Sequence, residues 1–230
     1  MCGIAGYVTT DNTSDRSALL RQLAGALRHR GPDDEGFFVA PQVGLAVRRL
    51  SIVDLACGQQ PIANEDGTIQ LVFNGEIYNY LELRAELERR GHRLTTNSDT
   101  ETLVHLYEDH GVEMLRFLRG MFAFALWDSR RKKLFLARDR LGKKPLNYLR
   151  ADGGLYFSSE LAPLLDARLA DWQIDPDALA EYLMFGFVSA PKSFVRQLEK
   201  LPPAHYLTWQ DGQIEVQRYW SFSQQPKTRA

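Results

Sequence analysis

The sequence predicts an α+β fold of stacked antiparallel hairpins, with helices lying between blocks of strands. Short apolar segments follow one another in pairs, and the turns that join them, such as Pro41-Gln42 and Asp211-Gly212, are brief. Helical segments separate these blocks instead of following every strand, which disfavours a regularly alternating parallel sheet. We therefore expect a layered fold built on antiparallel sheets.

The first half of the chain contains mostly strand-like segments. The predicted strands there are residues 3–8, 36–40, 43–47 and 69–73, because each is apolar or rich in β-branched side chains. Between the first two strands, residues 14–28 carry leucines at helical spacing, and Ser14 is the expected N-cap.

Two further helices are expected before the chain returns to strands. Residues 82–90 carry acid–base pairs at i,i+4 spacing and end at Gly91, and residues 100–110 place Leu103, Leu106 and Tyr107 on one face. The remaining predicted elements are strands at 121–127, 134–137, around Tyr148, 155–158, 204–209 and 214–218, and a helix at 175–185 with Pro176 in its first turn. The polar tail, residues 221–230, is expected to be loose.

Composition narrows the class of protein. The chain is 44% hydrophobic and 25% charged with a formal net charge of −1, so charge provides no argument for nucleic acid or an anionic membrane as a partner. No apolar run approaches the roughly 18 residues of a membrane helix, and the N-terminus lacks the features of a secretory signal. We expect a cytoplasmic protein with no nucleic-acid or membrane partner.

The two cysteines have different expected roles. They are too few for a disulfide framework and lack metal-ligand spacing, so no metal site is expected, and Cys57 is taken as a small loop residue. Cys2 becomes the first residue if Met1 is removed. A thiol then shares one residue with an α-amine, whose ordinary pKa of about 7.7–8.0 suits a general base. Gly3 would let the backbone pass close to a substrate.

Seven motifs occur in an order that resembles one known family: MCGIAGY, RHRGPDDEG, RRLSIVDL, FNGEIYNY, NSDTETL, GMFAFALWD and ARDRLGKKPLNY. Together they resemble the N-terminal glutaminase domain of glutamine-hydrolysing asparagine synthetases, a class II glutamine amidotransferase of the N-terminal-nucleophile hydrolase type. The resemblance implies a four-layer α-β-β-α sandwich of two antiparallel sheets. It also implies a glutaminase domain over residues 2–220, in which residues 185–220 lead toward a synthetase domain absent from this chain.

The resemblance implies how the chemistry would be divided among the residues. Cys2 matches the nucleophile that forms a thioester with the side chain of glutamine and releases ammonia. Asn74 and Gly75 match the oxyanion hole, through a side-chain amide and a backbone N–H respectively. Arg49 would bind the α-carboxylate of the substrate, because a guanidinium matches a planar carboxylate. The remaining matched residues are Glu76 and Asp99 for the α-ammonium group, and the backbone of Leu50, Ile52 and Val53 as the pocket lining.

Simpler interpretations of the same residues remain open at this stage. Asn-Gly is a strong hairpin signal, so Asn74 and Gly75 could form an ordinary turn. Of the neighbouring pair at 48 and 49, Arg48 is expected to be the solvated member. The basic loop at residues 28–30 is expected near the site entrance in a structural or gating role, and His29 is not expected to act as a base.

The same family resemblance bears on partners and cofactors. The pyrophosphate loop of the synthetase domain is missing, so ATP and Mg²⁺ are expected only for that absent domain, and no cofactor is expected for this chain. The expected partners are L-glutamine and a synthetase domain or separate protein that accepts ammonia, and a homodimer is compatible with the sequence. Two alternatives stay open: a catalytically silent glutamine-binding or interaction module, and a glutaminase that serves a different acceptor.

Overall fold

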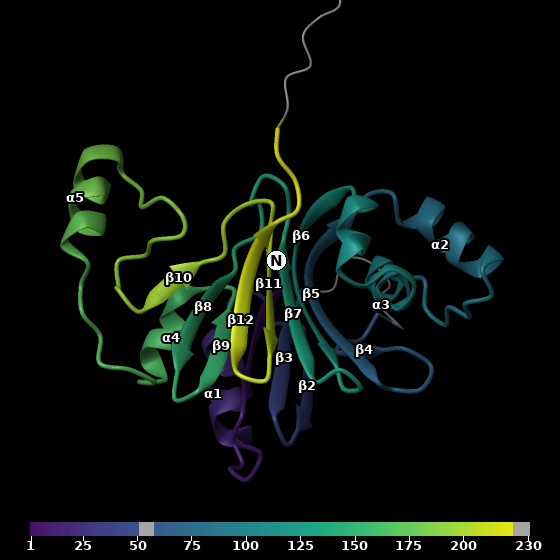
Figure 1. Ribbon diagram of the computed structural model, residues 1–230, viewed down its shortest axis with the longest axis horizontal. Helices are drawn as coiled ribbons and strands as arrows, with labels where there is room; N and C mark the ends of the chain where they lie inside the picture. The colour runs from purple at the N-terminus through teal and green to yellow at the C-terminus, as the bar shows by residue number, and fades with distance from the viewer. Residues whose placement is uncertain (51–57, 223–230) are drawn as a thin grey trace, which may run out of the picture.

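The computed structural model describes residues 1–50 and 58–222, and these form two antiparallel sheets packed face to face (Figure 1). The first sheet has the strand order β10-β8-β9-β1-β3-β2, with bounds β1 (Gly3–Thr9), β2 (Asp34–Ala40), β3 (Val43–Arg49), β8 (Asn147–Ala151), β9 (Gly154–Ser158) and β10 (Leu198–Lys200). The second has the order β12-β11-β7-β6-β5-β4, with bounds β4 (Ile62–Ala63), β5 (Ile69–Ile77), β6 (Gly120–Asp128), β7 (Lys133–Arg138), β11 (His205–Gln210) and β12 (Gln213–Arg218).

Helices cover the outer faces of both sheets. They are α1 (Ser17–Ala26), α2 (Tyr80–Arg89), α3 (Asp99–His110), the 3₁₀ helix η1 (Gly111–Arg116) and α4 (Leu161–Asp166). A further helix, α5 (Pro176–Phe185), lies to the side of the first sheet, and most of its large apolar side chains are exposed (Figure 1). One buried apolar cluster lies between the sheets, a second joins the second sheet to α2 and α3, and a third joins the first sheet to α1 and α4. The α+β class and the four-layer α-β-β-α sandwich are therefore confirmed.

Strand periodicity decides which side chains of β5 face the other sheet. Val72 belongs to the cluster between the sheets, whereas Leu71 and Phe73 belong to the cluster beneath α3. Because successive side chains alternate between faces, Asn74 and Glu76 share the face of Val72. Their side chains therefore point toward the first sheet, which carries the N-terminus of the chain.

One helix begins later than the sequence predicts. Ser14 is not the N-cap of α1: the helix starts at Ser17, and its N-cap position is held by Arg16 without a side-chain hydrogen bond. The N–H groups of Thr13 and Ser17 donate to the carboxylates of Asp11 and Asp15 respectively, at 2.9 and 2.8 Å. These local turns satisfy the backbone in a non-helical form, which delays the helix.

The expected helix signals of α2 and α5 agree with the structure. The i,i+4 pairs Arg84–Glu88 and Glu86–Arg90 form on α2, and the side chain of Asp175 caps α5 ahead of Pro176. Residues 185–220 contribute β10, which pairs with β8, and β11, which pairs with β7. None of the helices within the described ranges combines the length and hydropathy needed to cross a lipid bilayer.

Candidate active site

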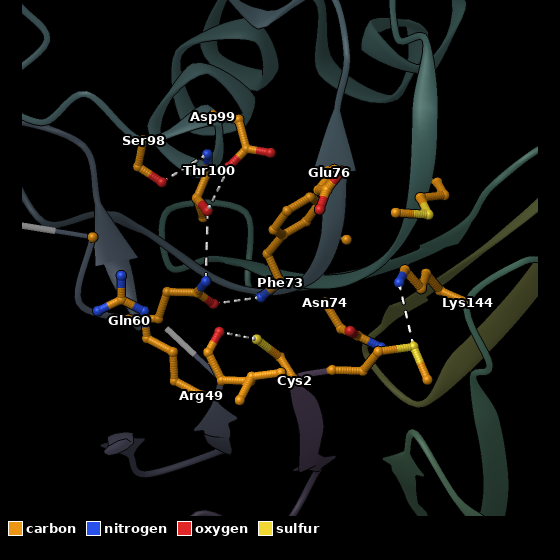
Figure 2. A pocket seen from close by; sticks show the side chains of 15 residues that line it. Cys2, Arg49, Gln60, Phe73, Asn74, Glu76, Ser98, Asp99, Thr100 and Lys144 are labelled. Atoms are coloured by element: carbon orange, nitrogen blue, oxygen red, sulfur yellow. Dashed lines mark hydrogen bonds between the residues drawn. The ribbon is translucent and has the colours of Figure 1, made fainter. Parts of the chain in front are cut away.

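A pocket of about 400 Å³ opens where the two sheets meet at the N-terminus of β1 (Figure 2). This volume suits a small-molecule ligand. The lining comes from the segment before β1, the end of β3, the edges of β5 and β6, and the start of α3. The residues are Met1, Cys2, Arg49, Leu50, Gly58, Gln60, Phe73, Asn74, Gly75, Glu76, Ser98, Asp99, Thr100, Met121 and Lys144.

Cys2 lies directly before β1, which pairs with β3 on one side and β9 on the other. Its Sγ points toward the backbone oxygen of Leu50 at 3.8 Å and is partly exposed in the pocket. Gly3 was expected to let the backbone pass close to a substrate, but its missing side chain would point away from the pocket. A Cβ at this position would meet Leu27 at 3.0 Å and Arg30 at 3.3 Å, so the missing side chain serves packing against the segment after α1.

Arg30 holds the backbone of Cys2 in place from behind the pocket. Its Nε donates to the backbone oxygen of Cys2 at 3.0 Å, while Nη1 pairs with Glu160 at 2.8 Å. Burial alone would raise the pKa of Glu160, but hydrogen bonds from Arg30 and His29 outweigh burial and hold the pKa below its ordinary value. The basic loop thus has a structural role, because it fixes the backbone that carries the thiol.

We expect Arg30→Ala to lower the kcat of turnover at this site by about 10- to 100-fold, the usual scale for a charge-assisted hydrogen bond. Steady-state assays at saturating substrate measure this loss. Arg28→Ala is the matched control, because Arg28 belongs to the same loop but is exposed, and it should retain full activity. An unchanged kcat in Arg30→Ala would show that the clamp on the Cys2 carbonyl is dispensable.

Asn74 presents an unused donor to the pocket. The residue is 1% exposed, and its Nδ2 has no hydrogen-bond partner among the described residues. Buried polar groups are normally paired, so an orphaned amide that faces a pocket indicates a ligand atom as its partner. The alternative of an Asn-Gly turn is wrong, since both residues lie inside β5 and pair with Ala123 and Phe122.

Backbone geometry also directs the N–H of Gly75 into this pocket. The N–H and C=O of Phe122, its partner in β6, both bond to Asp139, so they point away from β5. In an antiparallel pair, Gly75 must then point its own N–H away from β6. The neighbouring amides on that edge are taken: Phe73 donates to Gln60 Oε1 at 2.7 Å and Ile77 donates to Asp99 Oδ2 at 2.9 Å.

Gly75 cannot be replaced without moving the backbone. An added Cβ would lie 2.3 Å from the carbonyl oxygen of Met121 and 2.8 Å from Cα of Phe122. The glycine therefore allows β5 and β6 to approach closely at the point where its N–H enters the pocket.

Charged side chains line the pocket beyond these two donors. Arg49 ends β3 and is 6% exposed, and Glu76 lies on β5 two residues beyond Asn74. Asp99 starts α3 and is 9% exposed. Burial raises the pKa of Asp99, while hydrogen bonds from Ile77 and Thr100 oppose that rise. Two carboxyl groups and the cations Arg49 and Lys144 thus meet in one cavity, together with the thiol of Cys2 and the amide of Asn74.

The structure places the other predicted residues as follows. Leu50 lines the pocket, whereas Ile52, Val53 and Cys57 lie outside the described residues. The expectation for Arg48 is wrong: its side chain is 15% exposed, pairs with Glu35 at 2.8 Å and donates to the backbone oxygen of Ala24. It belongs to the outer face of β3, where it joins α1 to β2.

Sequence reasoning missed four polar residues that line the pocket: Gln60, Ser98, Thr100 and Lys144. Two of them make contacts that shape the site. Gln60 accepts from the N–H of Phe73 and approaches Thr100 Oγ1 at 3.5 Å, which ties β5 to α3. Lys144 is 7% exposed and its Nζ lies 3.5 Å from Met1 Sδ. Gln60 lies in the segment GQQP and Lys144 in the segment GKKP. Both segments look like loops, and neither indicates a pocket residue.

Comparison with known proteins agrees with this geometry. The chain is 40% identical to asparagine synthetase [glutamine-hydrolyzing] 1 of Bacillus subtilis (strain 168), over 98% of this chain and 36% of that protein. It is 44% identical to asparagine synthetase [glutamine-hydrolyzing] 3 of Arabidopsis thaliana, over 72% of this chain and 29% of that protein. The chain therefore spans about a third of the length of these curated relatives.

A solved structure shares the fold. Glutamine phosphoribosylpyrophosphate amidotransferase from B. subtilis, complexed with ADP and GMP, superposes with a TM-score of 0.70 at 19% identity, over 95% of this chain and 49% of that chain. The family model described as "Glutamine amidotransferase domain" matches residues 1–220. On this match and the pocket built around Cys2, the chain belongs to the glutamine amidotransferase domain family.

Proposed function

We propose that the chain hydrolyses L-glutamine to L-glutamate and ammonia through a thioester on Cys2. The observation that carries the proposal is the orphaned Nδ2 of Asn74, which shares a pocket with the Cys2 thiol. A nucleophile facing an unused buried donor is the arrangement that acyl transfer needs. The proposal requires that Met1 be removed, because the α-amine of Cys2 is otherwise part of an amide bond.

In the first half of the reaction the α-amine of Cys2 takes the thiol proton as Sγ attacks the side-chain carbonyl carbon of glutamine. Negative charge then develops on the carbonyl oxygen, where Nδ2 of Asn74 and the N–H of Gly75 donate. When the C–N bond breaks, the α-amine returns the proton to the leaving nitrogen, which departs as ammonia. A γ-glutamyl thioester remains on Sγ.

In the second half, water attacks the thioester and passes a proton to the same amine. The C–S bond breaks, the sulfur regains its proton, and glutamate leaves. The net change is glutamine plus water to glutamate plus ammonia. Throughout, Arg49 would hold the α-carboxylate while Glu76 and Asp99 would hold the α-ammonium group, which keeps the amide end at Cys2.

We further propose that the ammonia serves asparagine synthesis. The named relatives are asparagine synthetases, and each extends well beyond the part that this chain matches. Activation of the acceptor by ATP and Mg²⁺ would belong to that additional part or to a separate protein. A different acceptor is the alternative, and it would leave the chemistry at Cys2 unchanged.

The test follows glutamate and ammonia during incubation of Met1-free protein with glutamine. Equal amounts of both products support the proposal. Intact mass must be measured on the same sample, since protein that keeps Met1 lacks the amine. If fully trimmed protein binds glutamine without forming either product, the chain is instead a silent glutamine-binding module.

Asp99→Asn should raise KM for glutamine by about 100-fold, because the substrate ammonium loses a buried partner. Burial raises the pKa of Asp99, so its ionised form destabilises the folded state. The free energy of unfolding therefore falls as the pH rises through that pKa. The variant should therefore keep or gain thermal stability at pH 7. As the pH is lowered, KM of the wild type should begin to rise at a pH above the ordinary Asp pKa of about 3.9.

Asp171→Asn is the control, because Asp171 is exposed and lies outside the pocket. An unchanged KM in Asp99→Asn would contradict the assignment.

A further inference from the structure

A cluster of histidine and carboxylate side chains lies away from the pocket, where α3 meets the β4–β5 turn and the segment after α2. Cysteine spacing offers no reason to expect a metal in this chain, but histidines far apart in the sequence meet here. One ligand atom from each of Glu65, His92 and His105 lies within 4.8 Å of the other two. Figure 1 shows α3 between α2 and β4, the elements that bring these residues together.

We propose that this cluster is a binding site for a divalent transition metal of the zinc class. Glu65, His92 and His105 would supply three ligands, and Glu108 would supply a fourth. Imidazole nitrogen and carboxylate oxygen form the ligand set that Zn²⁺ accepts in four-coordinate sites.

The distances fit a site that needs only small side-chain movements. His105 Nδ1 lies 3.7 Å from Glu65 Oε2 and 2.8 Å from Glu108 Oε2. His92 Nδ1 lies 3.7 Å from the same oxygen of Glu108. Around a tetrahedral Zn²⁺ with bonds of about 2.0–2.2 Å, neighbouring ligand atoms are roughly 3.4 Å apart.

The surroundings of the ligands support a built site. His92 Nε2 lies 3.1 Å from Asp109 Oδ1, which leaves Nδ1 of that ring for a cation. Glu108 is held by Asn64, whose Nδ2 donates to Oε1 at 2.8 Å. Metal-binding histidines and carboxylates are commonly oriented by such outer partners.

His105 is the buried member of the cluster. Its side chain is 1% exposed, and its Nδ1 is the ring nitrogen that faces Glu65 and Glu108. Burial holds this imidazole in place beside the two carboxylates. Glu65 and Glu108 are 49% and 25% exposed, so the cluster is open to a cation from solvent.

The experiment titrates tag-free, metal-free Cys2→Ala protein with Zn²⁺ by calorimetry and with Co²⁺ by visible absorption. The Cys2 substitution removes the thiol of the pocket, which could itself bind these metals, and makes the result independent of glutaminase activity. We expect one equivalent of Zn²⁺ to bind, a d–d spectrum of four-coordinate Co²⁺, and a thermal midpoint raised by roughly 5 °C at a hundredfold excess over the dissociation constant.

Two added substitutions localise the binding. His92→Gln and Glu65→Gln should each weaken Zn²⁺ binding by at least about 10-fold. Glu65 is half exposed, so its replacement should leave the fold intact. His110→Gln, on the same helix but outside the cluster, should leave the affinity unchanged. Failure of Cys2→Ala protein to bind one equivalent, or undiminished binding in both cluster variants, would overturn the proposal.

Discussion

Replacing Cys2 by Ala is expected to lower kcat for glutamine hydrolysis by roughly 10⁴-fold or more, down to the background of the assay. The reason is that Cys2 carries the only thiol among the described residues that line the pocket, so both half-reactions are lost together. The fold should be unaffected, because the half-buried thiol makes only a weak hydrogen bond within the described part of the chain, 3.8 Å from the Leu50 oxygen. Glutamate release from Met1-free protein measures the effect.

A labelling experiment provides the control for this variant. A glutamine analogue that carries an electrophile at the amide position should add to the N-terminal peptide of the wild type. The Cys2→Ala protein still contains Cys57, so the absence of an adduct there would show that labelling depends on the site and not on any thiol. Glutaminase activity that survives Cys2→Ala would rule out the thioester mechanism.

Asn74→Ala should lower kcat by about 10²–10³-fold, the usual cost of losing one oxyanion donor, while KM changes little. Stability should not fall, because Nδ2 of Asn74 has no hydrogen-bond partner among the described residues to lose. This combination separates a catalytic donor from a structural one. A structural amide would lower the thermal midpoint when removed.

Asn12→Ala serves as the matched control for the Asn74 variant, since Asn12 is exposed and lies outside the pocket. Its kcat and thermal midpoint should equal those of the wild type. If Asn74→Ala instead keeps its kcat and loses stability, the oxyanion assignment fails even though the pocket remains.

Periodicity in the sequence was sufficient to predict much of the fold. The apolar runs of β5 and β6 and the leucine spacing of α1 are local signals, and they predicted elements within a few residues of their observed bounds. The start of α1 was missed because Asp11 and Asp15 stabilise turns that compete with helix. The two-residue β4 and three-residue β10 were missed because strands this short cannot display an alternating or apolar pattern.

The sequence predicted the site residues that belong to recognisable motifs, but not those whose place depends on how distant elements pack. Cys2, Asn74 and Gly75 could be assigned from their motifs, and the structure brings all three into one pocket. Gln60 could not be assigned, since its role depends on β5 and α3 meeting on either side of it. Arg48 was expected in solvent because nothing local indicates that Glu35 and Ala24 enclose it.

The edge of β5 beyond β4 has a consequence for solubility. β4 pairs only with Leu71 and Gln70. From Phe73 to Ile77, no strand of the described chain pairs with that edge of β5. Such an edge can template pairing with another molecule and so begin aggregation. Gln60 and Asp99 each occupy one amide along this edge, and they act as gatekeepers there. The N–H of Gly75, which would donate to the substrate, therefore lies on an edge that must also be protected from pairing with a second chain.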